Sequence, residues 1–209
     1  MIRFSLRYFS TLALMMLISA SLSAADLESA KRAYEQKDYA TAFKEFAQPA
    51  EQGKADAQLH LGKMYMMGQG VLKDLDQAMK WFKASALQGN ADAQFFLGSY
   101  YLLPQRDVAE GVKWMRLSAE QGNKDAQYLP GKAYIQGLKD FARDPVQAEM
   151  WLRLAAKDNL EFYQNELLAA ETQMSPEQLG NGKALAEAWK PKHGLRPDEK
   201  PPASGKVGS

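Results

Sequence analysis

The stretch that decides the fold is Ala55–Asn90, ADAQLHLGKMYMMGQGVLKDLDQAMKWFKASALQGN. Its pattern returns as ADAQFFLGSYYLLPQRDVAEGVKWMRLSAEQGN at 91–123 and as KDAQYLPGKAYIQGLKDFARDPVQAEMWLRLAAKDN at 124–159. The residues that align in all three stretches are Gly62, Gly98 and Gly131, Trp81, Trp114 and Trp151, and Ala86, Ala119 and Ala156. A period of about 33–37 residues is typical of solenoids of stacked helix pairs. One unit cannot bury its own apolar face, so we expect neighbouring units to share a core.

Each repeat is predicted to contain two helices. In the first helix of the first repeat, Ala57, Leu61 and Tyr65 recur at the spacing of one helical face. A glycine inside this helix predicts a close approach by the backbone or the Trp of the second helix. The second helix begins at an Asp that is followed three residues later by Gln or Glu, a capping pattern found at Asp74, Asp107 and Asp144. It ends at a residue that tolerates the left-handed conformation, namely Gly89, Gly122 or Asn159.

The rest of the chain is arranged around these repeats. A cap at Ser175 predicts a further helix after the last repeat. The last twenty residues contain four Pro and three Gly with little apolar content, which is typical of a disordered tail. The predicted organisation is a signal peptide at 1–24, a degenerate helix pair at 25–54, repeats at 55–90, 91–123 and 124–159, capping helices at 160–190 and a disordered tail at 191–209. The predicted fold is an all-α, right-handed solenoid of stacked antiparallel helix pairs.

The N-terminal segment has the features of a secretory signal peptide. Arg3 and Arg7 precede the apolar run Leu12–Ile18, and small residues at 21–25 offer a cleavage site after Ala24 or Ala25. An uncleaved anchor is the alternative, although a membrane span needs about 20 apolar residues. We expect an exported protein, periplasmic in a Gram-negative cell and otherwise secreted, with no membrane span in the mature chain.

Composition narrows the function classes. The chain has 209 residues, a net charge of +1 and no cysteine. Disulfides, thiolate metal sites and cysteine catalysis are therefore excluded. The balanced charge does not favour nucleic acid as a partner.

The repeats resemble a known family. The first repeat contains A-x-x-x-L-G-x-x-Y from Ala57 to Tyr65, G-x-G-V-x-x-D from Gly68 to Asp74, and A-x-x-W-x-x-x-x-A from Ala78 to Ala86. These motifs resemble the Sel-one-like repeat family, a branch of the tetratricopeptide-like superfamily. The resemblance implies a scaffold, adaptor or regulator that binds other proteins, often in the bacterial envelope. The third repeat departs from the pattern at Pro130, which we expect to kink or shorten its first helix.

No catalytic motif is found in the chain. The two imidazoles, His60 and His193, have no nucleophile and orienting acid in a recognisable motif. Carboxylates recur where they suit the helix dipole, at the first-helix starts Asp56, Asp92 and Asp125. We therefore expect no enzyme activity, no metal and no cofactor.

A partner-binding surface is predicted on the first helices. The side of each helix opposite its Ala-Leu-Tyr face carries apolar and aromatic residues, and the resemblance places that side in a concave groove. The predicted binding residues are Leu59, Lys63, Met66, Phe95, Ser99, Leu102, Tyr128, Lys132 and Ile135. The alternative is that curvature buries the stripe Leu59–Phe95–Tyr128 between adjacent first helices.

Three functions remain open at this point. The first is an adaptor whose groove holds a peptide or helix of another exported or envelope protein. The second is an inhibitor or immunity protein that binds a toxin enzyme in the envelope. The third is a cell-envelope hydrolase, which requires two convergent carboxylates that the spacing does not supply.

Overall fold

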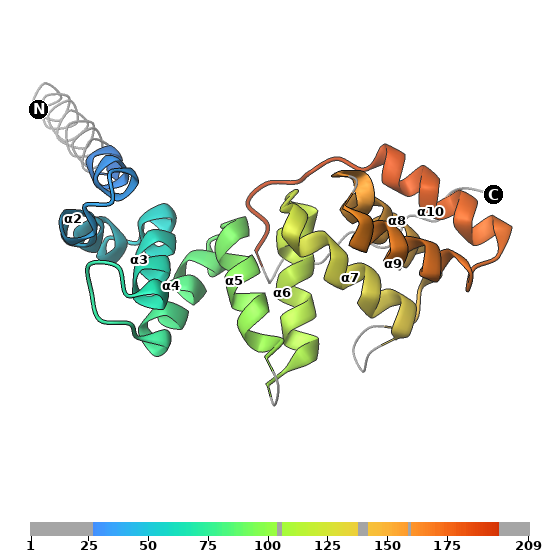
Figure 1. Cartoon of the computed structure of the whole chain (residues 1–209), viewed down its shortest axis with the longest axis horizontal. Coiled ribbons are helices and arrows are strands. Elements are labelled where there is room, and N and C mark those ends of the chain that lie inside the picture. Colours follow the sequence, from blue (N-terminus) through green and yellow to red (C-terminus); the bar gives the residue numbers. More distant parts are fainter. Residues whose placement is uncertain (1–26, 104–105, 138–141, 159, 197–209) are drawn as a thin grey trace, which may run out of the picture. The chain divides into compact units, whose positions relative to one another are not determined.

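The computed structural model describes residues 27–103, 106–137, 142–158 and 160–196. Every regular element in these ranges is helical, which confirms the all-α class and the antiparallel helix pairs (Figure 1). The right-handed twist of the stack stays a prediction. After a helix at 27–35, the elements are α2 (Tyr39–Glu51), α3 (Ala55–Met67), α4 (Leu75–Leu87), α5 (Ala91–Tyr101), α6 (Val108–Glu120), α7 (Lys124–Gln136), α8 (Pro145–Ala155), the short 3-10 helix η1 (Ala156–Asp158), α9 (Glu161–Glu171) and α10 (Pro176–Ala188).

The helices belong to two compact units, Met1–Ala84 and Ser85–Ser209, whose boundary falls within α4. The core of the first unit gathers Ala42, Phe46, Leu61 and Met64, all with at most 2% of their surface exposed. In the second unit α5 packs on α6, α6 on α7, and α7 on α8, while α9 and α10 both pack on α8.

The predicted starts and stops of the second helices are confirmed where the structure describes them. One carboxylate oxygen of Asp74 accepts hydrogen bonds from the backbone N–H groups of Asp76 and Gln77, both at 3.0 Å. Asp107 and Asp144 cap α6 and α8 in the same way. Ser175 and Gln178 form the reciprocal capping box at the start of α10. The stops at Gly89 and Gly122 have φ values of +89° and +93°, where L-residues with a side chain are strained.

The repeated glycine of each first helix is a point of close approach, as predicted, and the backbone of the second helix lies 3.1 Å from a Cβ atom added at Gly98 or Gly131. The alternative, approach by the Trp side chain, is wrong. A Cβ atom added at Gly62 would lie 2.6 Å from the ring of Phe82, the residue after the Trp. Gly98 faces Met115 and Gly131 faces Leu152, which follow the Trp in their own repeats. The helical rotation of about 100° per residue accounts for the shift.

Pro130 does not shorten its helix. α7 has 13 residues, the same number as α3. Proline removes one N–H donor from the helix. Pro130 is buried, and the packing of α7 against α6 and α8 maintains the helix around it.

The glutamine of the recurring Ala-Asp-Ala-Gln motif ties each first helix to the helix before it, a role that we did not predict. The Gln58 side-chain amide donates to the carbonyl of Ala50 at 3.1 Å. Gln94 donates in the same way to Ala86 at 3.2 Å. Each of these carbonyls also accepts from a backbone N–H just past its helix, Gly53 for Ala50 and Gly89 for Ala86, so the glutamine adds a second donor.

The predicted tail differs from the structure at its beginning. Residues 190–196 run back from α10 past α6 toward α5, and hydrogen bonds tie them to the second unit (Figure 1). The composition of this segment is low in apolar residues, but its backbone groups find polar partners. Residues 197–209 and the predicted signal peptide at 1–24 lie outside the described residues.

Candidate functional site

The nine predicted binding residues are divided between the two units. Leu59, Lys63 and Met66 belong to α3 in the first unit, and the other six belong to the second unit. Leu59 and Ile135 are only 6% and 8% exposed, so they offer little surface to a partner. The remaining seven are half-buried: Lys63, Met66, Phe95, Ser99, Leu102, Tyr128 and Lys132. Leu102 lies just past the end of α5, at its C-cap.

Phe95 and Ser99 have contacts within their own unit. Phe95 packs against the buried cluster that contains Met115 and Trp151. The Ser99 hydroxyl donates to the carbonyl of Phe95 at 2.9 Å, which satisfies it within the helix. Two of the predicted residues on α7, Lys132 and Ile135, line a hollowed surface.

An aromatic cluster lies at one end of that surface. The Tyr128 ring of α7 lies 5.4 Å from the Phe162 ring and 5.3 Å from the Tyr163 ring, both at the start of α9. Phe162 is 57% exposed despite its large apolar ring. Sequence analysis missed Phe162 and Tyr163 because the repeat pattern stops before α9.

An ion pair follows the aromatic cluster along the two helices. The Lys132 ammonium donates to a Glu166 carboxylate oxygen at 2.8 Å, and both side chains are about one-third exposed. This hydrogen bond lowers the pKa of Glu166 and raises the pKa of Lys132. Burial raises the pKa of the neighbouring Tyr128 hydroxyl. The pair therefore stays ionised around neutral pH and links α7 to α9.

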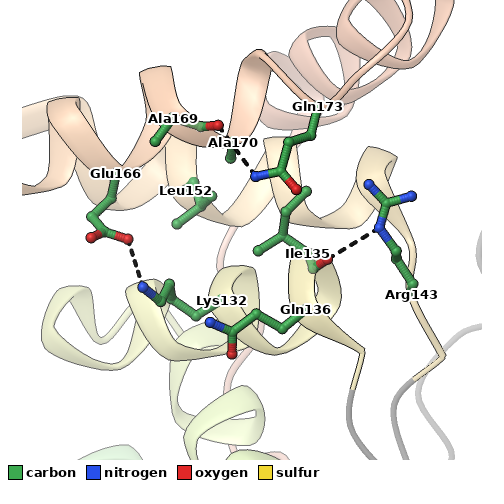
Figure 2. A pocket seen from close by; sticks show the side chains of 9 residues that line it. All are labelled: Lys132, Ile135, Gln136, Arg143, Leu152, Glu166, Ala169, Ala170 and Gln173. Atoms are coloured by element: carbon green, nitrogen blue, oxygen red, sulfur yellow. Dashed lines mark hydrogen bonds and ion pairs between the residues drawn. The ribbon is translucent and has the colours of Figure 1, made fainter.

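A cavity of about 530 Å³ lies beyond the ion pair (Figure 2). Figure 2 shows Lys132 and Gln136 on one wall, Glu166 and Gln173 on the opposite wall, and Leu152 of α8 between them. The Arg143 side chain donates to the carbonyl of Ile135 at 3.2 Å. The floor and walls combine apolar with polar groups, and the lining residues are Lys132, Ile135, Gln136, Arg143, Leu152, Glu166, Ala169, Ala170 and Gln173. We call the aromatic cluster, the ion pair and this cavity the α7–α9 face.

The α7–α9 face carries few titratable groups among its described lining residues. Glu166 is the one carboxylate among the described residues that line the cavity, and it is paired with Lys132. His60 stacks on Phe46 in the first unit, with ring centroids 4.5 Å apart. Within the described ranges no group of three His, Cys, Asp or Glu side chains is placed to hold a metal ion.

A buried carboxylate on α8 belongs to an ion-pair network that links α8 to α9. Glu149 of α8 has no exposed surface and pairs with Arg153 at 2.6 Å, and Arg153 also pairs with Glu171 of α9 at 2.7 Å. Burial raises the pKa of Glu149. A Cβ atom added at Gly182 of α10 would lie 2.4 Å from the Glu149 side chain. Glu149 and Arg153 stand four residues apart, the spacing of a helical ion pair, and that signal could have identified the network.

Replacing Glu166 with glutamine is expected to remove a pH-dependent part of the stability. The folded pKa of Glu166 is lowered, so its contribution is present above the unfolded pKa and is lost as pH falls through the folded pKa. Because the pair is partly exposed, we expect a difference of about 0.5 kcal/mol near neutral pH. Urea unfolding of both proteins from pH 7 to pH 2 measures it. A difference that grows in acid would contradict the assignment.

Comparison with known proteins fits this architecture. A family profile for the Sel1 repeat matches residues 55–90, 91–123 and 124–160, just over half of the chain. The chain belongs to the Sel1 repeat family. Sel1 repeats generally mediate protein interactions, and Sel1 repeat proteins are typically non-catalytic.

Two solved structures are similar to this Sel1 repeat protein. One is a protective antigen present in uropathogenic Escherichia coli strains that displays an SLR fold, with 29% identity and a TM-score of 0.62 over 79% of this chain. The other is a Sel1 repeat protein from Oxalobacter formigenes, with 29% identity and a TM-score of 0.63 over 75% of this chain. The matches span 38% and 63% of those two chains. No curated protein matches this chain.

None of the helices in the described part of the chain combines the length and the apolar content that crossing a bilayer requires.

Proposed function

We propose that this Sel1 repeat protein is a non-catalytic adaptor that binds a segment of another protein on its α7–α9 face. The observation that carries the proposal is the exposed Phe162 ring, which packs edge-on against Tyr128 beside a cavity whose lining combines apolar and polar groups. Large exposed aromatic residues next to a pocket are typical of the positions that dominate binding energy at protein interfaces.

The composition of the α7–α9 face favours a peptide or helix as the ligand. Exposed Ala169 at the cavity wall can contact an apolar side chain, while the exposed Gln136 and Gln173 can exchange hydrogen bonds with a backbone. The Lys132–Glu166 pair sits between the aromatic cluster and the cavity, where it can orient a polar group of the ligand. A mixed surface of this kind gives both affinity and register.

We also propose that the protein works outside the cytoplasm, with an exported or envelope protein as its partner. The support is the sequence of residues 1–24, with its basic start, apolar run and small-residue end. Fractionation of the source cells, with N-terminal sequencing of the recovered protein, tests this step. A mature chain that starts at Ala25 or Asp26 in the exported fraction is the expected result, and an intact N-terminus in the cytoplasm would contradict it.

Replacing Phe162 with alanine is expected to weaken capture of the partner at least about tenfold, because the ring is the largest exposed apolar group of the face. The full chain is immobilised, an envelope extract is passed over it, and the retained proteins are quantified by mass spectrometry. The matched control is Leu168→Ala. Leu168 is 59% exposed on the same helix and lies about 200° around it from Glu166.

The outcomes separate binding from folding. The proposal requires one protein that wild type and Leu168→Ala retain equally and that Phe162→Ala loses, with equal thermal melting of all three. Equal loss in both variants, or equal retention in both, would contradict the assignment of the α7–α9 face. A retained toxin enzyme would identify the protein as an inhibitor.

A further inference from the structure

The segment after α10 is held through its backbone. The Lys192 N–H donates to the Glu120 carbonyl at 2.8 Å, and the Gly194 N–H donates to the Gln121 side-chain oxygen at 2.6 Å. The Gln94 side-chain amide donates to the carbonyl of Leu195 at 2.6 Å. These three hydrogen bonds within four residues fix the backbone of the segment. We call residues 190–196 the strap.

The surface under the strap is made of the turns after α4 and α6 and of residues in the adjoining turns of α5 and α6. We call Gly89, Gln94, Glu120, Gln121 and Gly122 the turn track. A Cβ atom at Gly89 would lie 2.5 Å from the strap carbonyl of Gly194, and a Cβ atom at Gly122 would lie 3.2 Å from Pro191. The two glycines that end α4 and α6 therefore also leave room for a second backbone to pass closely.

The polar groups of the turn track form a connected network. Gln94 is fully buried, and its amide nitrogen serves both Ala86 at 3.2 Å and Leu195 of the strap. Its oxygen accepts from the Gln121 amide at 2.7 Å, so the two glutamines orient each other. The Lys192 ammonium lies 3.4 Å from the Glu120 carboxylate, which adds one charge contact. The track is thus arranged for a backbone with a lysine two residues before a glycine.

We infer that the turn track is a second binding surface, which takes a peptide segment, and that the strap is its resident ligand. The surface lies wholly within the second unit and shares no residue with the α7–α9 face. A segment with the same Lys-x-Gly chemistry can occupy the turn track only after the strap leaves. Release of the strap therefore controls access to the surface.

Replacing Gly194 with proline is expected to release the strap. Gly194 has a φ of +69°, whereas proline fixes φ near −65° and lacks the N–H that donates to Gln121. Trypsin reports release, because Lys192–His193 is the one tryptic bond within 190–196 that is not followed by proline. We expect cleavage there to accelerate at least about tenfold, the effect of losing a hydrogen bond and a backbone conformation. Gln121→Ala removes the acceptor and serves as a second variant, and Gly180→Ala, whose added Cβ meets no atom within 4 Å, is the control.

A synthetic peptide of residues 190–196, Lys-Pro-Lys-His-Gly-Leu-Arg, then tests whether the emptied track binds a ligand. It should bind the full-length Gly194→Pro protein saturably and bind wild type at least about tenfold more weakly, because the tethered strap has a millimolar effective concentration. Unchanged cleavage in both release variants, or no peptide binding by the released protein, would overturn the inference. If the wild-type protein is a dimer and dilution to monomer makes the Lys192–His193 bond sensitive to trypsin, the strap on the turn track belongs to a second copy. That result would overturn the intramolecular assignment.

Discussion

Replacing Trp151 with alanine is expected to lower the free energy of unfolding of the second unit by about 3–5 kcal/mol, the cost of deleting a large core side chain. Trp151 of α8 is 2% exposed and belongs to the buried cluster that contains Met115 and Ala126. Its ring also lies edge-on to Trp189, which follows α10, at a centroid distance of 6.2 Å. The substitution therefore removes contacts with α6, α7 and the end of α10 together.

Trp81, the equivalent residue of the first repeat, provides a comparison for Trp151. Trp81 occupies the same repeat position in the first unit but is only half-buried against its core. We expect Trp81→Ala to cost clearly less than Trp151→Ala. Urea unfolding of both variants, followed by circular dichroism, measures the two values. A Trp151→Ala protein as stable as wild type would contradict the packing described for α8.

Replacing Gly98 with valine is expected to cost about 3 kcal/mol, the upper part of the usual range for overpacking a core. A Cβ atom at this position would lie 2.9 Å from the Met115 side chain and 3.1 Å from both the Gly111 carbonyl and the Met115 backbone nitrogen. A side chain can rotate away, but the two backbone groups belong to α6. The helices α5 and α6 must therefore separate to admit the valine.

Gly180, in the same unit, is a helical glycine with free space around it, in contrast to Gly98. It also lies inside a helix, α10, and a Cβ atom there meets nothing within 4 Å. Gly180→Ala should stabilise the protein by up to about 1 kcal/mol, because alanine favours the helix. Thermal melting of both variants tests the pair of predictions. If Gly98→Val melts at the wild-type temperature, the close contact between α5 and α6 is wrong.

Much of the fold is predictable because its signals are local. The capping role of Asp74 needs only the first turn of one helix, and the stop at Gly89 needs only its own backbone conformation. The repeat ranges read from the sequence differ from the matched family ranges by one residue, at the end of the third repeat. Repetition strengthens each local signal, since the same residue types recur at the same step.

What the sequence analysis missed depends on contacts between distant residues. Phe82, rather than its neighbour Trp81, faces Gly62 because the rotation of one helix against another is set by packing. The strap finds its partners Gln94 and Gln121 at separations of 101 and 73 residues. Low apolar content predicts that such a segment cannot build a core, but it does not exclude backbone hydrogen bonds to an existing one.

Of the two helices that form the α7–α9 face, only α7 was predicted to contribute to the site. The position of Lys132 and Ile135 on the outer side of a first helix follows from the repeat, and both line the cavity. Phe162 and Glu166 belong to α9, where the repeat pattern has ended and gives no register for a face. Their position opposite α7 arises from the packing of α9 on α8 and from the Arg153–Glu171 pair.

The central claim is that the α7–α9 face binds another protein, and site-specific photo-crosslinking in the source cells tests it most directly. A photoreactive phenylalanine derivative is placed at position 162 of the full chain, and at position 168 as the matched exposed control on the same helix. We predict a single crosslinked product of defined mass from position 162 and none from position 168. Products of equal yield from both positions, or none from position 162 in cells that contain the folded protein, would contradict the claim.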